Sequence, residues 1–468
     1  MKILANILFF LTLICCFSCQ APKQVTISPS SDIRNFRWNK ADTASSASTA
    51  GDISWKAFFA DSNLVRLIDT ALIANSDYQQ AMRQIEIARI TYQTNKMALL
   101  PSLELQAGFN TQKASANTSS VSYPNASRVY NDLQLSLTSS WELDIWGKLN
   151  SQKKASKARF LSTQAGSTFV RTQLIAAIAG AYYELMAYDE QLFLIEKNLR
   201  LQATALDIVN VQKEAGKATA LAVQQFEAQL HNTRAQKCHV SRMIVNAETY
   251  LNTLVGRFPQ PIIRSHFITK QNIGLNLKVG VPVQLLERRP DIFQALGLLA
   301  AAGFDVQSAR RAFYPSLTIA PTIGFAASDA HLLFDKTSLL WNVAGGLVAP
   351  LFQKNQIKGN YKLKLEEQRI ALLAYEKVLK QSVAEVQNAM TTQEILNEEV
   401  NNKTNEVLAL DNAVKTSHNL YAFGYATYLE VINAQKTVRD AELELVDIHK
   451  ERMLNAIDLY RALGGGRF

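Results

Sequence analysis

The 468-residue chain has few cysteines and few histidines. Three of its four cysteines lie within the first 19 residues, so Cys238 is the only cysteine in the rest of the chain, and no disulfide can form within that part. The six histidines are dispersed without metal-ligand spacing, and no nucleophile elbow or phosphate-binding loop occurs. These absences leave no motif for an enzyme, a metal site or a bound cofactor.

After the first 20 residues the chain also lacks an apolar run of about 18 residues that is free of charges, prolines and polar breaks. A helical membrane protein is therefore not expected, whereas a β-barrel stays open because its strands are short and alternating. Lysines and arginines outnumber acids by 49 to 40, but the two signs are interspersed on helix-like segments. This pattern favours a solvated surface over a nucleic-acid-binding one.

The first residues have the form of a secretory signal. Lys2 precedes a predominantly apolar segment from Ile3 to Phe17, which is too short to span a membrane. Ser18 before Cys19 suits a lipoprotein cleavage site that leaves Cys19 as the acylated N-terminus, with ordinary cleavage nearby as the alternative. We predict a signal peptide over 1–18 and a lipidated segment and linker over 19–60, anchored stably because each buried CH₂ contributes about 0.8 kcal/mol.

One eight-residue pattern occurs twice. Residues 216–223 read GKATALAV and residues 424–431 read GYATYLEV, with five identical positions at an offset of 424 − 216 = 208. The tripeptide Pro-Ser-Leu at 101–103 and 315–317 repeats at a similar offset, 315 − 101 = 214. A period this long indicates a duplicated domain rather than a solenoid. We predict two repeats, over 61–257 and 285–468, joined by a linker over 258–284.

Each predicted repeat holds two strands in which apolar and polar residues alternate. The strands are expected at about 103–112, 131–146, 317–327 and 339–352. Ten residues is roughly the length of a transmembrane β-strand. Trp141, Trp146 and Trp341 lie toward strand ends, where aromatic girdles of membrane barrels lie. A soluble sheet with core tryptophans explains the strands equally well.

Long helices follow the strands in each repeat. From Leu174 to Val209 and from Leu372 to Val414, apolar residues recur at steps of four and three, a coiled-coil period. In the repeated octapeptide, the glycine suits a left-handed helix end and the threonine suits the N-cap of the next helix. Helical hairpin tips are therefore predicted at about 214–220 and 422–428.

Four strands per chain cannot close a membrane barrel, which begins at eight strands. An open edge in lipid leaves backbone groups unpaired, so membrane-spanning strands would require several copies of the chain. Two copies would give eight strands and a barrel filled by its side chains, whereas three would give twelve strands and room for a lumen.

The stretches LLERRPDI (285–292) and SWELDIWGKL (140–149), the doubled halves and the hairpin tips resemble the TolC-like outer membrane efflux family, in particular its lipoprotein branch that serves RND-type pumps. The resemblance covers nearly the whole chain after the signal. It implies a mainly α fold with membrane β: a homotrimer with a twelve-stranded β-barrel in the outer membrane of a Gram-negative bacterium, continued by a long periplasmic α-helical barrel. It also implies a passive conduit for small molecules, without cofactor or nucleic acid, that docks on a periplasmic adaptor (a membrane fusion protein) linked to an inner-membrane RND-type transporter.

By position, the resemblance assigns the pore constriction of the periplasmic gate to three residues of the second hairpin. Glu430 takes the place of an acidic ring, Asn433 that of a second ring that is usually aspartate, and Tyr421 that of a tyrosine that holds some members closed. Ala426 stands where some members have an arginine that pairs across the closed tip. A first-turn acid stabilised by the helix dipole is the alternative for Glu430.

The resemblance also implies that both tips contact the adaptor, although helix capping alone explains their glycines and threonines. The expected contact residues are Gly216, Ala218, Thr219, Leu221, Gly424, Ala426, Thr427 and Leu429. In LLERRPDI, Pro290 is predicted to begin a helix that Asp291 caps, and Arg288 and Arg289 to pair with acids where the repeats join.

Two other functions stay open. A lipid-anchored periplasmic coiled-coil adaptor would share the hairpins and the lipid, but it would not need four alternating strands. A channel for type I protein secretion would share the whole architecture and differ only in its cargo.

Overall fold

The computed structural model describes residues 53–113, 129–265, 267–271 and 289–466. The predicted signal peptide, Cys19 and Arg288 lie outside these ranges. The described residues form two compact units, and each unit takes segments from both halves of the sequence. One unit contains the strands with residues 85–113, 129–163 and 295–375, and the other contains the remaining described residues.

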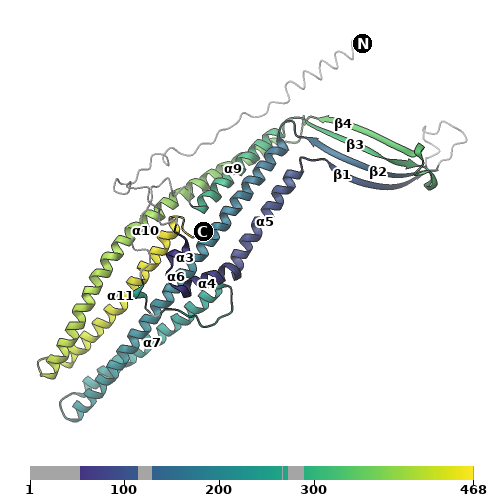
Figure 1. The fold of residues 1–468 in the computed structure, drawn as a ribbon. Coiled ribbons are helices and arrows are strands. Elements are labelled where there is room, and N and C mark those ends of the chain that lie inside the picture. Colours follow the sequence, from purple (N-terminus) through teal and green to yellow (C-terminus); the bar gives the residue numbers. More distant parts are fainter. Residues whose placement is uncertain (1–52, 114–128, 266, 272–288, 467–468) are drawn as a thin grey trace. The chain divides into compact units, whose positions relative to one another are not determined.

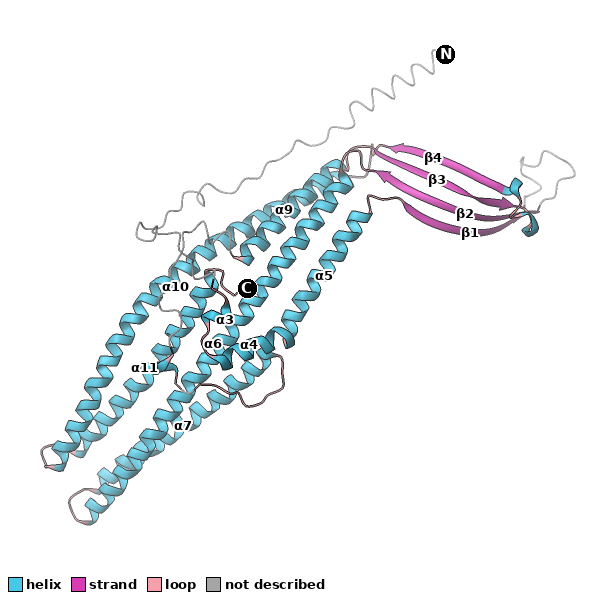
Figure 2. Ribbon diagram, in the orientation of Figure 1, coloured by secondary structure: helices cyan, strands magenta, loops and turns pink. Residues whose placement is uncertain are grey.

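Each half has the predicted order of a helix, two strands and a helical hairpin (Figures 1 and 2). The first half consists of α5 (Ser76–Met97), β1 (Ser102–Lys113), β2 (Val129–Leu143), α6 (Lys148–Glu214) and α7 (Ala220–Val255). The second consists of α9 (Pro290–Arg311), β3 (Ser316–Ala327), β4 (Leu339–Val348), α10 (Gln356–Ala422) and α11 (Tyr428–Ala462). Two short helices, α3 (Trp55–Phe58) and α4 (Ser62–Ala74), precede α5, and single 3₁₀ turns cover Ile268–Lys270, Ala330–Leu332 and Lys336–Ser338.

The four strands form one antiparallel sheet in the order β1-β2-β3-β4. Leu105 pairs with Leu137, Leu137 with Ile323, and Ile323 with Trp341, so an apolar row crosses all four strands. Leu105 is 72% exposed and Trp341 is 73% exposed, so no other part of the described chain covers this face. The sheet therefore has an uncovered apolar face.

The opposite face of the sheet is polar. One residue along from the apolar row, Glu104 pairs with Thr138, Thr138 with Thr322, and Thr322 with Asn342. Within the described residues, β1 and β4 each have one neighbour, so the outer edge of each strand is unpaired. An open sheet with one apolar face needs further copies of the chain before it can lie in lipid.

Two strands end earlier than the sequence analysis predicted. The prediction that the second strand reaches Trp146 is wrong: β2 ends at Leu143, because the Asp144 carboxylate accepts hydrogen bonds from the backbone N–H groups of Leu149 (2.9 Å) and Asn150 (2.7 Å) and begins α6. Trp146 lies in the turn, where its indole N–H donates to the Pro315 carbonyl at 2.7 Å.

The last strand was likewise predicted to reach residue 352, and this is also wrong. β4 ends at Val348. Pro350 has no backbone N–H to offer a neighbouring strand, and Lys354 and Asn355 adopt positive φ angles of 47° and 65° that turn the chain into α10.

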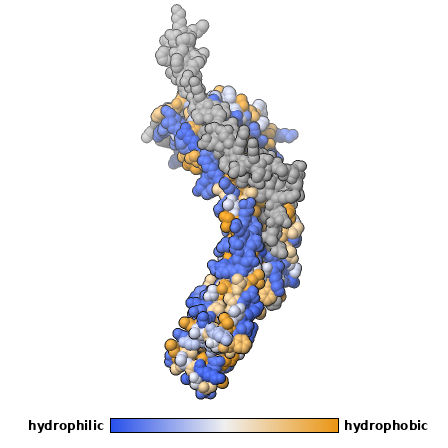
Figure 3. All heavy atoms as spheres, turned by 90° about the vertical axis from the view of Figure 1, so that its left-hand side faces the viewer, coloured by the Kyte–Doolittle hydropathy of each residue, from blue (hydrophilic) through white to orange (hydrophobic). Residues whose placement is uncertain are grey.

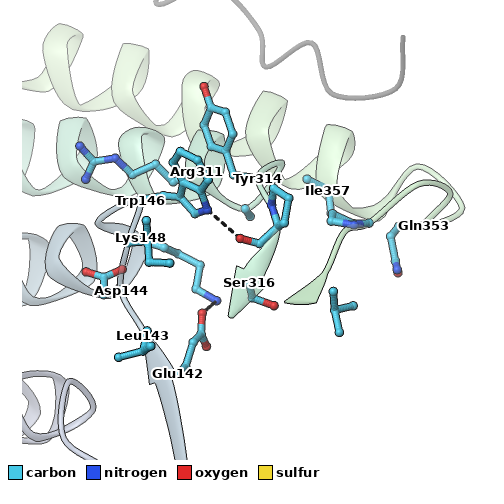
Figure 4. A pocket seen from close by; sticks show the side chains of 15 residues that line it. Glu142, Leu143, Asp144, Trp146, Lys148, Arg311, Tyr314, Ser316, Gln353 and Ile357 are labelled. Atoms are coloured by element: carbon cyan, nitrogen blue, oxygen red, sulfur yellow. Dashed lines mark hydrogen bonds and ion pairs between the residues drawn. The ribbon is translucent and has the colours of Figure 1, made fainter. Parts of the chain in front are cut away.

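A pocket of about 190 Å³ lies where the strand ends meet the helices (Figure 4). Its Lys148 ammonium pairs with Glu142 at 2.5 Å, and its Arg311 guanidinium donates to the Gly147 carbonyl at 2.7 Å and to Ser151. Trp146 stacks on the ring of Tyr314, with 5.0 Å between centroids. These charged groups bind one another and the backbone of the turn. The pocket is therefore part of the turn between the strands and the helices, and we assign it a structural role.

Among the described helices, α9 alone has the length and apolar composition of a membrane-spanning helix. It nevertheless packs closely on another helix, because a Cβ placed on Gly297 would lie 2.8 Å from the Ser162 Cβ of α6. A charged pair, Arg159 and Asp305, joins the same two helices.

The core of the second unit is formed by α4, α6, α7 and α11. Ile68, Tyr182, Leu251 and Met453 come from these four helices and are fully buried together. Asp61 ties this core to the chain between the halves, since its carboxylate accepts from the Tyr182 hydroxyl (2.7 Å), the Ser265 hydroxyl (2.8 Å) and the Asn63 N–H that it caps (2.8 Å).

The helix start predicted at Pro290 and the pairing of Arg289 with acids are confirmed, although the partners of Arg289 in the described chain lie in the second repeat and not across the join between repeats. Pro290 is the first residue of α9, and Arg289, only 4% exposed, donates to Asp291 (2.7 Å) and to Glu385 of α10 (2.9 Å). Its guanidinium also donates to the Ala462 carbonyl at the end of α11 (3.2 Å). One buried arginine thus joins the start of α9, the middle of α10 and the end of α11.

His449 of α11 gives the fold a dependence on pH. The side chain is 8% exposed and its Nδ1 lies 3.2 Å from the Arg452 guanidinium, and burial, followed by the Arg452 charge, lowers its pKa from 6.5 to about 4. Between pH 6.5 and about 4, the His449 imidazole is therefore protonated in the unfolded chain and neutral in the folded chain. The free energy of unfolding falls as the pH drops through this range. The loss at the acid limit is about 3 kcal/mol per chain.

Thermal unfolding at a series of pH values tests this expectation. The difference in Tm between the wild type and His449→Gln should change sharply between pH 6.5 and 4 and be constant above pH 7. A difference that is the same at every pH would show that His449 does not titrate in this way.

Candidate functional site

The first hairpin tip has the predicted capping geometry. Gly216 adopts φ +71°, and the Lys217 N–H closes the end of α6 on the Gln212 carbonyl at 2.7 Å. Thr219 is the N-cap of α7, with its hydroxyl oxygen accepting from the Ala222 N–H at 3.2 Å. The glycine is required here because a left-handed residue ends the helix without a Cβ penalty.

The second tip repeats this geometry. Gly424 adopts φ +79°, and the Tyr425 N–H donates to the Leu420 carbonyl at 2.8 Å. Thr427 is the N-cap of α11. The predicted tips at about 214–220 and 422–428 therefore match the turns observed between α6 and α7 and between α10 and α11.

Glu430 lies in the first turn of α11 and completes a capping box. Its carboxylate accepts from the Thr427 backbone N–H at 2.6 Å and from the Thr427 hydroxyl at 3.0 Å. These hydrogen bonds, the backbone one first, lower the pKa of Glu430 below its ordinary value. The carboxylate therefore caps the helix and also stays ionised in mildly acidic solution.

Asn433 follows Glu430 by three residues on the same side of α11, and both side chains are exposed. Tyr421 lies elsewhere: it is half-buried, and its hydroxyl donates to the Gln212 side-chain oxygen of α6. The structure thus groups Glu430 with Asn433 and uses Tyr421 as a link between the two hairpins.

The two hairpins also pack against each other behind the tips. Tyr428 and Ile432 of α11 pack on an apolar cluster that includes Val209 of α6 and Phe226 of α7. Farther along α11, the fully buried Arg439 donates to the Thr233 hydroxyl of α7 at 3.3 Å and to its neighbour Asp440. Sequence reasoning missed this second link, because a lone arginine in a helix carries no signal of its burial.

The predicted contact residues of the tips divide into two groups. Ala218 and Ala426 are half-buried, whereas the others lie on the exposed surface: Gly216, Thr219, Leu221, Gly424, Thr427 and Leu429. Two large exposed side chains of the second tip, Phe423 and Tyr425, were missed. Their signal was present as two aromatic residues at positions where the first tip has alanine and lysine.

Comparison with known protein families identifies the family to which this chain belongs. A model of the outer membrane efflux proteins matches residues 67–257 and again residues 281–465, one match for each half. The chain belongs to the outer membrane efflux protein family. The double match confirms the predicted internal duplication.

Similar proteins of this family come from several Gram-negative bacteria. The cation efflux system protein CusC of Escherichia coli strain K12 is 26% identical over 447 residues, which cover 95% of this chain and 93% of that protein. The outer membrane protein OprJ of Pseudomonas aeruginosa is 28% identical over 438 residues, 92% of this chain and 89% of that protein. The probable outer membrane lipoprotein SilC of Salmonella typhimurium is 24% identical, with 92% of each chain covered.

Solved structures of the family share the fold. The open state of the Neisseria gonorrhoeae MtrE outer membrane channel has a TM-score of 0.85 and 26% identity, covering 96% of this chain and 98% of that one. A crystal structure of CusC has a TM-score of 0.81 and 25% identity, covering 88% and 95%. The protein is therefore an outer membrane efflux channel with the TolC-like fold, which spans the outer membrane and extends into the periplasm.

Proposed function

We propose that the channel is a homotrimer in which four strands from each chain form one twelve-stranded barrel. The observation that carries this proposal is the open sheet with an uncovered apolar face and two unpaired edges. Pairing β4 of one chain with β1 of the next would satisfy both edges, and twelve strands leave room for a lumen. The polar row of Thr138, Thr322 and Asn342 then faces the lumen, and the apolar face contacts outer-membrane lipid.

The trimer serves as the outer membrane part of a tripartite pump, together with a periplasmic adaptor and an inner-membrane RND-type transporter. It moves cargo without a chemical step. Small molecules are favoured over secreted proteins, because similar proteins include the cation efflux system protein CusC of Escherichia coli and the toluene efflux pump outer membrane protein TtgF of Pseudomonas putida. Such different cargoes on one fold suggest that the partners select what is exported.

Reconstitution of the purified trimer into planar bilayers tests this function. We expect stepwise ion conductance from the protein alone, since a passive conduit needs no energy source. A detergent-stable trimer that never conducts, even after destabilisation of its tips, would contradict the proposal.

The division of the chain is proposed along the same lines. Residues 1–18 form the signal peptide, 19–60 the lipidated segment and linker, 61–257 the first repeat, 258–284 the linker between repeats, and 285–468 the second repeat.

We further propose that Glu430 and Asn433 line the constriction of the periplasmic gate. Three copies of Glu430 would form a ring of carboxylates that favours cations. Glu430→Gln is expected to lower the ratio of cation to anion permeability several-fold in planar bilayers, because it removes three charges at the narrowest point.

Two controls separate the charge of Glu430 from its role as a cap. Glu430→Asp keeps the charge but shortens the side chain, and Thr427→Ala removes the hydroxyl hydrogen bond while keeping the carboxylate. Both should retain cation selectivity. If Thr427→Ala changes selectivity as much as Glu430→Gln does, the carboxylate acts through the cap alone.

Lipidation at Cys19 is a separate proposal. Cys19→Ala should abolish metabolic labelling with radioactive palmitate, because no acylated N-terminal cysteine can then form. The barrel should still assemble, since the described strands do not involve Cys19. Labelling that persists in the variant would place the lipid on another residue.

A further inference from the structure

The loop between β3 and β4 connects the ends of these strands that lie away from the helices. β3 follows α9 and β4 precedes α10, so the helices adjoin the other ends of both strands (Figures 1 and 2). Because the channel extends from the outer membrane into the periplasm through its helices, the loop lies on the outer side of the membrane.

The loop places an aromatic ring on the apolar face of the sheet. The ring of Phe334 packs edge-on against Phe325 of β3, with 5.8 Å between centroids. Phe325 pairs with Leu135 of β2 and with Leu339 of β4. This row lies two residues along the strand from Ile323, so it belongs to the same uncovered apolar face. The loop therefore folds onto the apolar side of the sheet and not onto the polar side.

Hydrogen bonds within the loop hold the backbone on both sides of this ring. Short 3₁₀ turns precede and follow it. The Asp335 carboxylate accepts from the Thr337 N–H at 2.9 Å and from the Thr337 hydroxyl at 2.7 Å. The Ser338 hydroxyl donates to the Leu332 carbonyl at 2.8 Å. Phe334 is nevertheless 70% exposed, so the loop presents the ring outward without burying it.

Polar groups surround a short apolar run in this loop. Residues 328–337 read SDAHLLFDKT, and the Asp329 carboxylate pairs with the His331 ring nitrogen at 3.0 Å. Apolar side chains between charged ones are typical of a segment at a membrane interface, where polar groups contact headgroups and apolar ones contact acyl chains. By contrast, hydrophobic and hydrophilic residues are intermixed over the hairpin end at the bottom of Figure 3.

The height of the sheet brings the ring within reach of lipid. On β4 the apolar face runs from Leu339 to Leu347, and 347 − 339 = 8 steps of about 3.3 Å give about 26 Å along the strand. A tilt of about 40° reduces this to a depth of about 20 Å, whereas the apolar band of a membrane barrel is about 25 Å tall. Since Phe325 pairs with Leu339, a ring that packs on Phe325 falls at the outer limit of that band.

We propose that Phe334 inserts into the acyl chains of the outer leaflet and fixes the depth of the barrel at its outer end. This inference rests on the proposed function, in which the apolar face contacts lipid. The occupant is lipid because the ring continues that face across its contact with Phe325. A loop that closed the lumen would instead place the ring on the polar face.

A fluorophore in the loop tests the insertion. Phe334→Cys and the matched control Lys336→Cys, each in a Cys238→Ser background, are labelled with nitrobenzoxadiazole and reconstituted as full-length trimers into phosphatidylcholine vesicles. A doxyl group at carbon 5 of the acyl chain should quench the label at position 334 at least threefold more than the label at 336. Aqueous iodide should show the opposite order, after subtraction of the label that Cys238→Ser alone takes up.

Substitutions without a label test the consequence for the channel. Phe334→Asp should lower the temperature at which the trimer dissociates in vesicles by several degrees, because a charge replaces the ring at the lipid contact, and Phe334→Leu should change it little. Trimer mass and conductance should be unchanged in both variants.

Three results would overturn the proposal. Equal quenching by iodide at positions 334 and 336 would place the ring in water, and protection from both quenchers would place it under a neighbouring copy. A changed conductance in Phe334→Asp without lipid quenching at position 334 would place it in the lumen. Absence of a trimer or of conductance in the wild type would instead overturn the proposed function.

Discussion

Arg289→Met is expected to lower the free energy of unfolding by about 3–5 kcal/mol per chain. The variant leaves Asp291, Glu385 and the Ala462 carbonyl without the guanidinium that they share in the wild type. Removing one partner of a buried ion pair costs this much because the charge that is left behind, here chiefly the Asp291 carboxylate with 15% of its side chain exposed, stays largely away from water without compensation. Scanning calorimetry or circular dichroism of the detergent-solubilised protein at a fixed scan rate should show a clear fall in Tm.

An exposed ion pair provides the matched control. Arg89 pairs with Glu86 at 2.6 Å on the surface of α5, with about half of its side chain exposed. Arg89→Met should cost less than about 1 kcal/mol, because solvent screens exposed pairs. Equal Tm changes in the two variants would show that Arg289 does not hold the helix junction together.

Gly324→Leu is expected to prevent the sheet from forming and so to abolish the trimer. A Cβ at this position of β3 would lie 2.3 Å from the Leu135 carbonyl oxygen and 2.5 Å from the Ser136 Cα, both backbone atoms of β2. Backbone cannot move aside as a flexible side chain does, so the cost should reach at least about 3 kcal/mol per chain. The β2–β3 pairing is also where the strands of the two halves join.

The fraction of protein that migrates as a heat-sensitive trimer measures this effect. It should fall at least tenfold in Gly324→Leu, with the monomer accumulating in the periplasm. Gly345→Leu on the neighbouring strand β4 is the control, because a Cβ there would meet no atom within 4 Å of the same chain. A normal trimer yield from Gly324→Leu would mean that β2 and β3 are not paired as described.

The order of elements was predictable because it follows from residue periodicity. Alternation with period two predicted all four strands, and the glycine and threonine of each octapeptide predicted both tips within a residue or two. Strand ends were not predictable in this way. Ile145 continues the alternation of β2, but the Asp144 carboxylate accepts hydrogen bonds from the first backbone N–H groups of α6, so the strand ends and a helix begins.

The site was predictable only in part. Residues that are identical in the two halves could be predicted, because the conformation of the turn requires them. Gly216 and Gly424 match for conformational reasons, and Thr219 and Thr427 match because they cap helices. The residues that differ between the tips, such as Tyr425 against Lys217, are not required by the turn, so the repeat carries no signal for them. Burial of Arg439 against Thr233 depends on how two distant helices pack, which no local pattern records.

The mass of the detergent-solubilised protein, measured by light scattering alongside its mobility on a gel before and after boiling, tests the central claim most directly. Three chains sharing one barrel predict a particle of three times the chain mass that converts to monomer only on heating. A monomer that leaves the cells without detergent would contradict the shared barrel, and with it the channel.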